Sequence, residues 1–198
     1  MFVSLFCTLK RSSQETKKWR PAKADRGFTF LSHNLTIAYH RTNLLTRYGR
    51  WQGNDNNGGL EKLGFKEGYR VDVDVADSSW AEAPLFHDVL IFNTGHWWGA
   101  RSKFHPVKSP MLFFENDQPL MPPLSPYSGL KKTLENMILF VERNKKKNGV
   151  LFFLTQSPRH FEGGDWDEGG SCHRMVPLLS HQAVAGAGAL FKGKKWDE

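Results

Sequence analysis

Cysteine is scarce in this sequence, and uninterrupted apolar segments are short. Its 198 residues include two cysteines, Cys7 and Cys172, which are too few for a disulfide framework and match no metal-ligand spacing. Whether they pair with each other is left open by the sequence. No apolar run approaches the roughly 20 residues of a membrane-spanning helix. The longest run near the start, Phe2 to Leu9, lacks a basic region before it and a cleavage site after it, so we expect no signal peptide.

Positive charge is in excess. Lys+Arg 27 against Asp+Glu 20 gives a formal net charge of +7. A positive net charge can favour binding to nucleic acid, to a membrane surface or to acidic polysaccharide. Here the excess lies in separate clusters around Lys10 to Lys18, Arg143 to Lys147 and Lys192 to Lys195. This distribution favours a solvated surface, so no nucleic-acid partner is expected, and a basic nucleic-acid binder is kept only as a third hypothesis.

Two short apolar runs predict parallel strands. Val89 to Phe92 and Val150 to Leu154 are continuous runs of the kind found at the centre of parallel sheets, covered on both faces. Between them, Ser125 as N-cap and Pro126 at the first helical position predict a helix that ends at Lys145 to Lys147. Strand, helix and strand predict a right-handed crossover. The expected fold class is therefore α/β, with a mostly parallel sheet between helices.

The remaining segments give weaker signals. Aromatic and β-branched residues predict a strand region from Phe28 to Tyr39, and strict alternation predicts a half-buried or edge strand from Arg70 to Val75. Asn and Gly residues predict a loop from Gly49 to Gly59, and prolines predict an irregular surface excursion from Ser109 to Pro126. Helical spacing predicts one apolar helix face made of Leu130, Leu134, Met137, Ile138 and Val141.

Candidate functional residues follow the two apolar runs, because ligands of open α/β sheets bind outside the carboxyl ends of the strands. Asn93 to Gly99 follows the first run, and Thr155 to Cys172 follows the second. Both segments combine aromatic rings with histidine and amide or guanidinium groups, which suits stacking on sugar rings and hydrogen bonding to hydroxyls. The substrate-binding candidates are Trp97, Trp98, His160 and Trp166.

Each candidate has a structural alternative. Trp97 and Trp98 could pack in a core, and Asn93 could cap the following turn. His160 could be a surface histidine with satisfied hydrogen bonds. The acidic residues between 165 and 168 lack the oxygen spacing and glycine of a calcium loop, so they could form a solvated turn, and no metal site is expected.

Four sequence blocks resemble those of the plant trichome birefringence-like family, also called the PC-esterase domain. The blocks are Ala38 to Leu45, Tyr48 to Trp51, Phe92 to Trp98 and Ser157 to Asp167. The resemblance runs from Met1 to about Leu179. Residues 1–179 are therefore identified as a partial domain of this family, and residues 180–198 as a divergent tail that is Ala/Gly-rich and then basic.

The resemblance implies a three-layer α/β/α fold of the SGNH/GDSL type. It also implies O-acetylation of wall polysaccharides such as xylan, xyloglucan, mannan or pectin, mostly by Golgi type II membrane proteins. Family catalysis resembles a Ser-His-Asp system, in which the serine of a Gly-Asp-Ser block attacks an acetyl donor and an Asp-x-x-His block supplies acid and base. The implied partner is a polysaccharide acceptor, and no cofactor is implied beyond the acetyl donor.

The sequence departs from this pattern at the catalytic blocks. Neither Gly-Asp-Ser nor Asp-x-x-His occurs in the 198 residues, so we expect an inactive member that is incomplete at both ends. Asn93 matches the position that resembles the asparagine block of SGNH enzymes, which makes it the oxyanion candidate. Ser4 and Cys7 fall in a helix expected to face packing, and Ser157 has no identifiable third orienting group, so none is expected to replace the nucleophile.

Three further expectations concern localisation, an alternative function and stability. The sequon Asn34-Leu35-Thr36 is a candidate glycosylation site that fits the secretory pathway, although the chain has no visible signal or anchor. A non-catalytic carbohydrate-binding or scaffold protein is the alternative function. Loss of the first strand and last helix of a parallel sheet exposes apolar faces, so marginal folding and aggregation are expected.

Overall fold

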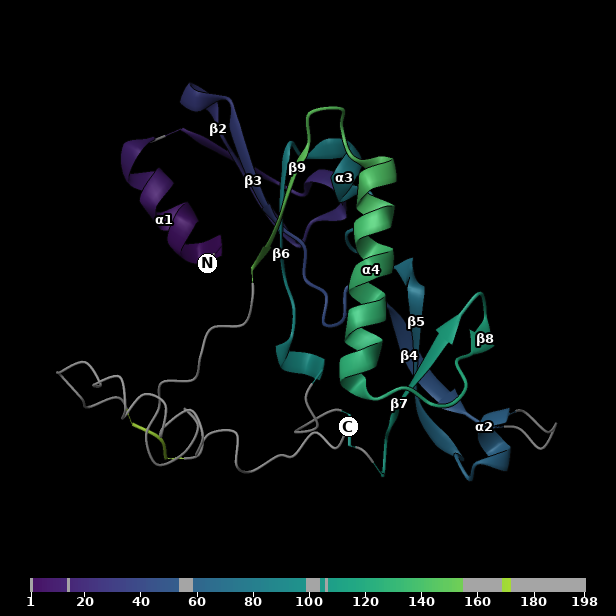
Figure 1. The fold of residues 1–198 in the computed structure, drawn as a ribbon. Helices are drawn as coiled ribbons and strands as arrows, with labels where there is room; N and C mark the ends of the chain where they lie inside the picture. Colours follow the sequence, from purple (N-terminus) through teal and green to yellow (C-terminus); the bar gives the residue numbers. More distant parts are fainter. Residues whose placement is uncertain are drawn as a thin grey trace, which may run out of the picture. The chain divides into compact units, whose positions relative to one another are not determined.

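Figure 1 shows the computed structural model, which describes residues 2–13, 15–53, 59–98, 104–105, 107–154 and 169–171. The chain divides into two compact units, Met1–Gln156 and Ser157–Glu198. The described helices and strands belong to the first unit, and the second unit is described only at residues 169–171. The expected boundary between residues 179 and 180 lies outside the described residues and stays a prediction.

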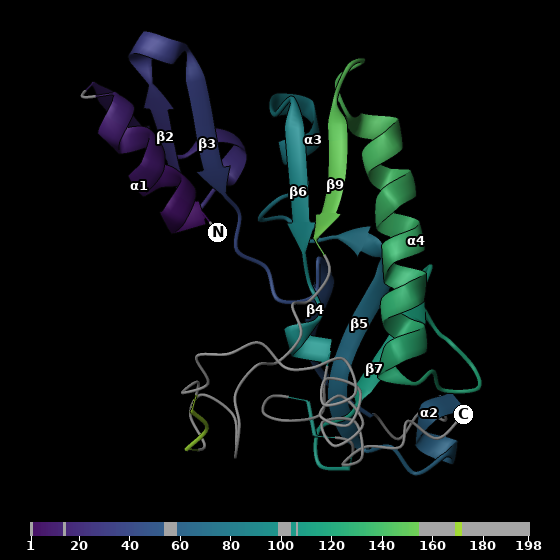
Figure 2. The ribbon, with the colours of Figure 1, turned by 60° about the vertical axis from the view of Figure 1, so that its left-hand side comes forward.

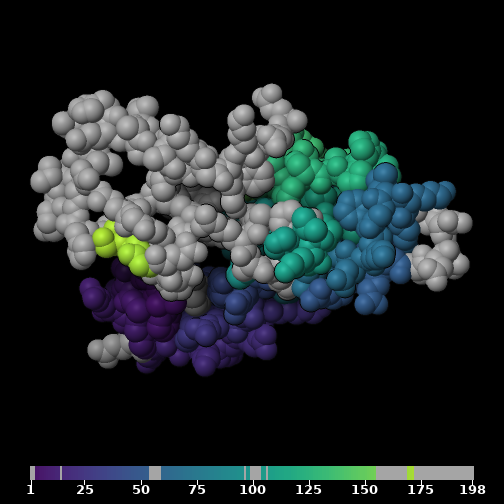
Figure 3. Space-filling view, turned by 90° about the horizontal axis from the view of Figure 1, so that it is seen from below, coloured from purple at the N-terminus to yellow at the C-terminus, as the bar shows by residue number. Residues whose placement is uncertain are grey.

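The first unit begins with a helix packed on a small antiparallel sheet. Helix α1 (Phe2–Ser12) is followed by strands β1 (Thr16–Trp19), β2 (Arg26–Phe30) and β3 (Leu35–Tyr39), which pair in the order β1-β2-β3. The ring of Phe6 in α1 lies 4.2 Å from that of Phe28 and 6.0 Å from that of Phe30, measured between centroids. In the space-filling view, these N-terminal residues form one contiguous region in purple and dark blue (Figure 3).

The strand region predicted from Phe28 to Tyr39 is a hairpin rather than one strand. A short 3-10 turn, η2 (Leu31–His33), separates β2 from β3, and a similar turn, η1 (Pro21–Lys23), separates β1 from β2. Asn34 ends η2 in a left-handed conformation with φ 46°. Asparagine tolerates this conformation, which lets the chain reverse between the two strands. The run of β-branched and aromatic residues did not reveal this reversal.

A second sheet has the order β4-β5-β7-β8 and contains the most buried strands. It comprises β4 (Thr46–Gln52), β5 (Glu67–Ala76), β7 (Met111–Glu115) and β8 (Gln118–Pro119), with the short helix α2 (Gly59–Lys62) between β4 and β5. The edge alternative for Arg70 to Val75 was wrong, because β5 pairs with β4 on one side and β7 on the other, and this part of β5 is more than half-buried, with Val71, Asp72 and Val73 all buried. The loop predicted from Gly49 was also wrong up to Gln52, because these residues pair with β5.

Strand β7 overturns the surface excursion predicted from Ser109 to Pro126. Residues Met111 to Phe114 are all buried, and β7 pairs with β5 in parallel, with Val71 opposite Phe113. The prolines flank the strand instead of interrupting it. The two residues between β7 and β8, Asn116 and Asp117, both have positive φ, as a tight hairpin turn requires. The prolines of the whole segment therefore led to a wrong prediction for the four-residue apolar run Met111 to Phe114.

Strands β6 (Val89–Asn93) and β9 (Val150–Leu154) form a parallel two-stranded sheet, in register from Val89 opposite Val150 to Asn93 opposite Leu154. The predicted parallel pairing is confirmed. Burial on both faces is not observed within the described part of the chain, where Ile91 and Phe152 are about half exposed. The pleat explains this difference, because alternate residues such as Leu90 and Leu151 pack inward while their neighbours point away.

Helix α4 (Pro126–Asn144) packs against strands of both the mixed sheet and the parallel pair (Figures 1 and 2). Its predicted cap is confirmed, since the Ser125 hydroxyl oxygen accepts from the Ser128 N–H at 3.2 Å. Near its start Leu130 packs on the cluster around Phe113, and near its end Met137 packs with other apolar residues in a second cluster. Ile138 does not belong to the buried face and is 49% exposed.

The α/β class is confirmed for the described residues. Two strand ladders are parallel, β5 with β7 and β6 with β9, and the remaining four are antiparallel. Each antiparallel pair joins strands that are consecutive in the chain, with α2 in the connection between β4 and β5, whereas each parallel pair encloses a longer crossover that includes helix α3 (Ala83–Phe86) or α4.

The contact between α4 and β7 predicts an unusual response to alanine. Gly to Ala in a helix interior is ordinarily worth about 1 kcal/mol of added stability. At Gly129, however, a Cβ would lie 2.2 Å from Cζ of Phe113, whose ring is buried in the core. We expect Gly129→Ala to lower the free energy of unfolding by about 1–3 kcal/mol through overpacking. Urea unfolding followed by circular dichroism measures this change.

Gly49→Ala is the matched control, because a Cβ at Gly49 meets nothing within 4 Å. This variant should keep the unfolding midpoint or raise it slightly. A Gly129→Ala protein as stable as the parent would show that α4 does not sit this close to the Phe113 ring.

Candidate functional site

The carboxyl ends of β6 and β9 lie side by side, since Asn93 pairs with Leu154 in register. The two sequence segments predicted to carry the site therefore leave the sheet at the same edge. This confirms the prediction that they follow neighbouring parallel strands. Residues 155–168, which include His160 and Trp166, lie outside the described residues, so their roles stay predictions.

Asn93 is exposed at this edge, as the last residue of β6. Within the described part of the chain, no hydrogen bond engages its side chain, so the capping alternative finds no support there. Gly95 follows with φ 142°, a conformation that L side chains rarely adopt, and the chain then turns into the short 3-10 helix η3 (His96–Trp98). The backbone N–H of Trp98 closes this turn on the carbonyl of Gly95 at 3.1 Å.

Trp98 anchors the turn in the core. Its side chain is 4% exposed, and its ring is parallel to that of Phe113 with centroids 6.2 Å apart. Its indole N–H donates to the Thr94 hydroxyl at 3.0 Å, and that hydroxyl donates to the Asn43 carbonyl at 3.3 Å. The packing alternative therefore applies to Trp98. Trp97, in contrast, is 41% exposed and is the described tryptophan of this segment that a ligand can reach.

The segment that follows β6 is also supported by residues that the sequence analysis did not predict. The Asn43 amide donates to the Tyr48 hydroxyl at 2.8 Å, and the Tyr48 ring meets the Phe104 ring edge-on at 6.0 Å. Two blocks recognised only by resemblance, Ala38 to Leu45 and Tyr48 to Trp51, thus support the segment that follows β6. No local pattern could have shown this, because the partners are about 50 residues apart in the chain, as in the pair Thr94 and Asn43.

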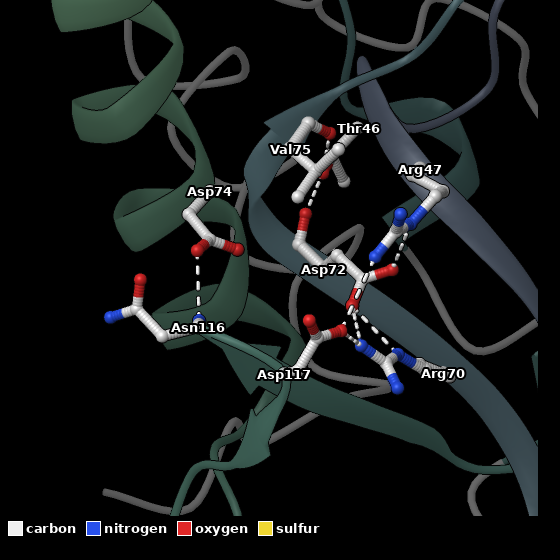
Figure 4. Close-up of polar contacts among 8 residues, drawn as sticks. All are labelled: Thr46, Arg47, Arg70, Asp72, Asp74, Val75, Asn116 and Asp117. Carbon is white, nitrogen blue, oxygen red and sulfur yellow. Dashed lines mark hydrogen bonds and ion pairs between the residues drawn. The ribbon is translucent and has the colours of Figure 1, made fainter.

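Strand β5 carries a buried carboxylate, Asp72 (Figure 4). Asp72 is 3% exposed and accepts hydrogen bonds from Arg47 Nε at 2.8 Å and Arg70 Nε at 2.7 Å. Asp117 in the β7–β8 turn also pairs with Arg70 and lies 3.5 Å from Arg47. The cluster joins β4, β5 and the β7–β8 turn in an ion-pair network around the buried Asp72.

The cluster raises the basicity of both arginines. The pKa of Arg47 is raised by its hydrogen bond to Asp72 and by the charge of that carboxylate. Burial alone would lower the pKa of Arg70, but hydrogen bonds to Asp72 and Asp117 outweigh burial and raise it. Nearby, Asp74 accepts from the Asn116 N–H at 2.8 Å (Figure 4). The paired charges of Asp72 and Asp117 with the two arginines indicate a structural role in fixing the turn.

The other candidate residues lie elsewhere. Ser4 and Cys7 are exposed on α1 instead of packed, and Cys7 is a free thiol. Cys172 lies outside the described residues. Asn34 is exposed in the turn between β2 and β3, and its glycosylation stays a prediction.

The described residues contain no group of three or more His, Cys, Asp or Glu side chains placed to hold a metal ion. None of the described helices has both the length and the apolar character that crossing a bilayer demands.

The described residues define an α/β protein in which two parallel strands, β6 and β9, end at the same edge. A family model covers residues 1–192, and its description is "PC-Esterase: GDSL/SGNH-like Acyl-Esterase family found in Pmr5 and Cas1p". The chain belongs to this family, and the resemblance inferred from its sequence blocks is confirmed.

Several curated Arabidopsis thaliana proteins are similar to this chain. Protein trichome birefringence-like 13 is 69% identical over 179 residues, covering 90% of this chain and 43% of that protein. Protein trichome birefringence-like 12 is 42% identical, covering 91% of this chain and 43% of that protein. The protein named xyloglucan O-acetyltransferase 2 is 27% identical, covering 88% of this chain and 41% of that protein. The chain thus spans less than half the length of these relatives, and no solved structure matches it.

The buried carboxylate yields a stability prediction. Asp72→Asn removes the charge that two guanidinium groups share, and it leaves those groups without a full counter-charge. Because Arg47 is half exposed and screened by solvent, we expect a loss of about 2 kcal/mol in the free energy of unfolding, less than for a fully buried pair. Chemical denaturation at neutral pH measures the loss.

Asp117→Asn provides the comparison, since it removes a carboxylate from the same cluster whose side chain is 76% exposed. Its expected cost is below about 0.5 kcal/mol. Equal costs for the two variants would contradict the central position of Asp72.

Proposed function

We propose that this chain is part of a polysaccharide O-acetyltransferase of the Golgi apparatus. In this proposal it supplies the oxyanion-stabilising residue, Asn93, and part of the surface that binds the polysaccharide acceptor. One observation carries the proposal: in a member of the PC-Esterase family, Asn93 is exposed at the edge shared by β6 and β9. The relative named xyloglucan O-acetyltransferase 2 supports acetyl transfer to a sugar hydroxyl as the reaction class.

The chemistry assigns a role to the Asn93 amide. When a nucleophilic hydroxyl attacks an acetyl carbonyl, the carbonyl oxygen gains negative charge, and a fixed N–H donor stabilises it by about 3–4 kcal/mol. Asn93 projects from the last position of a strand, and Thr94 and Trp98 hold the following turn. A donor mounted in this way is positioned before the reaction, which is what oxyanion stabilisation requires.

The remaining catalytic groups are not among the recognisable motifs of these 198 residues. Gly-Asp-Ser and Asp-x-x-His do not occur in the sequence. Without an activated nucleophile, the acetyl group has no protein oxygen to which it can transfer. We therefore expect this chain alone to form no acetyl-enzyme and to be inactive in transfer.

A second candidate function rests on Trp97. Its exposed ring stands next to the buried Trp98 in η3, so an indole is presented to solvent by an anchored turn. Aromatic rings of this kind bind the apolar faces of sugars. A non-catalytic carbohydrate-binding protein is therefore the alternative, in which Trp97 binds a wall polysaccharide without any acyl chemistry.

Asn93 can be tested in a chimera. The matched segment of trichome birefringence-like 13, 69% identical, is replaced by this chain's residues, and acetyl transfer to a panel of wall polysaccharides is measured. We expect the chimera to transfer acetyl groups as the parent protein does. Asn93→Ala in the chimera should lower kcat by about 10²–10³-fold, because one oxyanion donor is lost.

Asn34→Gly in the same chimera is the control, since it changes an exposed asparagine of another sheet and keeps the left-handed backbone available. It should leave kcat unchanged. A folded chimera that is inactive beside an active parent would contradict the proposal, as would a parent without transfer activity or an acetyl adduct on the isolated 198-residue chain.

Trp97 is tested by calorimetry with xyloglucan and xylan oligosaccharides on the isolated chain. Trp97→Ala removes the exposed ring, and we expect binding to weaken about tenfold, the loss of one stacking contact. Tyr127→Ala, which removes another exposed aromatic ring from α4, should leave affinity unchanged. Absence of binding by the folded parent chain would rule out the carbohydrate-binding alternative.

A further inference from the structure

Two histidines meet between separate parts of the first unit. His40 follows β3 directly, and His87 follows α3 and precedes β6 by two residues. Their Nε2 atoms are 3.3 Å apart, and their rings are nearly perpendicular, at 83°. Both side chains are half-buried. This distance is that of a hydrogen bond between the two imidazoles.

The surrounding bonds define which nitrogen carries each proton. Nδ1 of His40 lies 2.8 Å from the Ser79 carbonyl oxygen. A carbonyl oxygen only accepts, so Nδ1 of His40 carries the hydrogen and Nε2 of the neutral ring is the acceptor. The Nε2–H of His87 then donates to Nε2 of His40. In the neutral pair the hydrogen of His87 is therefore on Nε2, and Nδ1 of His87 is the position for a further proton.

The pair joins the three-stranded sheet to the segment that leads into β6. Other contacts contribute to this joint. Trp19 in β1 meets Phe86 in α3 edge-on at 5.7 Å, and Lys23 pairs with Glu82 at 2.6 Å with both side chains exposed. The Ser79 hydroxyl also donates to the Arg41 carbonyl at 3.3 Å. Exposed ion pairs contribute little to stability, so the histidine contact is an important part of the polar attachment.

The charged groups around the pair disfavour an added proton. His87 faces His40 from the end of β3 and Lys146 from the segment after α4, and Asp88 is next to it in the chain. Burial, then His40 and Lys146, lower the pKa of His87 to about 4, while Asp88 opposes them weakly. Lys146 is itself bonded to Asp88 at 2.8 Å, which takes up much of that carboxylate's charge. Arg41, Asp25 and Asp77 lie beside His40 and Ser79.

We propose that the His40–His87 pair is an acid-sensitive joint whose hydrogen bond opens on proton uptake and loosens the three-stranded sheet from the α3–β6 segment. A proton added to Nδ1 of His87 creates a cation in a half-buried site near Lys146. Separation of the two rings returns this cation to water. This property is independent of acetyl transfer.

The direction of the pH effect follows from the lower proton affinity of His87 when the two rings are in contact (the closed form) than when they are separated (the open form). An exposed histidine has a pKa near 6.5, so the open form takes up protons between about pH 6.5 and pH 4 while the closed form resists them. The closed form, in which the two rings are in contact, is therefore fully favoured above pH 7. Its population falls as the pH falls. Allowing for solvent screening of half-buried rings, we expect a shift of about tenfold toward the open form between pH 7.5 and pH 5.

The experiment is amide hydrogen exchange of the whole chain at pH 7.5 and pH 5, corrected for intrinsic exchange rates. Protection in β1, β2 and β3 should fall about tenfold more than protection in β5 and β7. His87→Gln keeps an N–H donor for His40 without a titrating ring, and it should remove most of this pH dependence. His33→Gln, at an exposed histidine in the same sheet, should behave like the parent.

A direct measurement covers the case in which His87→Gln fails to fold. Carbon-13 labelling of the histidine rings gives the titration of each imidazole in the parent chain. The proposal requires His87 to resist protonation down to about pH 5. It is overturned if His87 titrates near pH 6.5, if protection of the three-stranded sheet does not change with pH, or if folded His87→Gln keeps the full pH dependence.

Discussion

The structure depends on one packing constraint, the apolar side of α4 placed against two groups of strands. Near its start the helix approaches β7 so closely that Gly129 leaves no room for a methyl group beside Phe113. Farther along, Met137 and Val141 pack in the cluster that contains Trp80. A single rigid helix thereby fixes the mixed sheet and the β6–β9 pair relative to each other within the first unit, because both clusters must be filled at once.

The geometry of the candidate site depends on this packing of α4 against the strands. The Phe113 ring that contacts the helix is also the ring against which Trp98 stacks. Trp98 holds Thr94 through its indole N–H, and Thr94 is adjacent to Asn93. The exposed asparagine is thus connected to the core through a short series of packed and hydrogen-bonded side chains. A donor that must meet a developing charge needs this kind of support, since mobility would reduce its value.

Two polar joints hold the remaining strands by different means. The Asp72 cluster satisfies a buried carboxylate with two guanidinium groups, so it is stable when all its members are charged. The His40–His87 contact is favoured when His87 is neutral, because burial and the nearby Lys146 disfavour a further proton on that ring. The first joint lies within the mixed sheet, and the second lies where the N-terminal sheet meets α3.

Local pattern in the sequence determined much of the secondary structure and part of the site. Ser125 and Pro126 located the start of α4, and the apolar runs located β6 and β9 and their parallel pairing. Position after the first apolar run located the candidate segment Asn93 to Gly99, whereas the choice of Asn93 within it came from the family resemblance. These locations depend on periodicity, capping and strand order, all of which are written in neighbouring residues.

Only the tertiary structure decided which side chains are buried and which groups meet. It turned the proline-flanked β7 into a buried strand, made Asp72 internal, and separated buried Trp98 from exposed Trp97. It also brought His40 to His87, which are 47 residues apart in the chain. The physical reason is that burial and pairing are set by partners distant in sequence, whereas a local pattern records only the intrinsic preference of each segment.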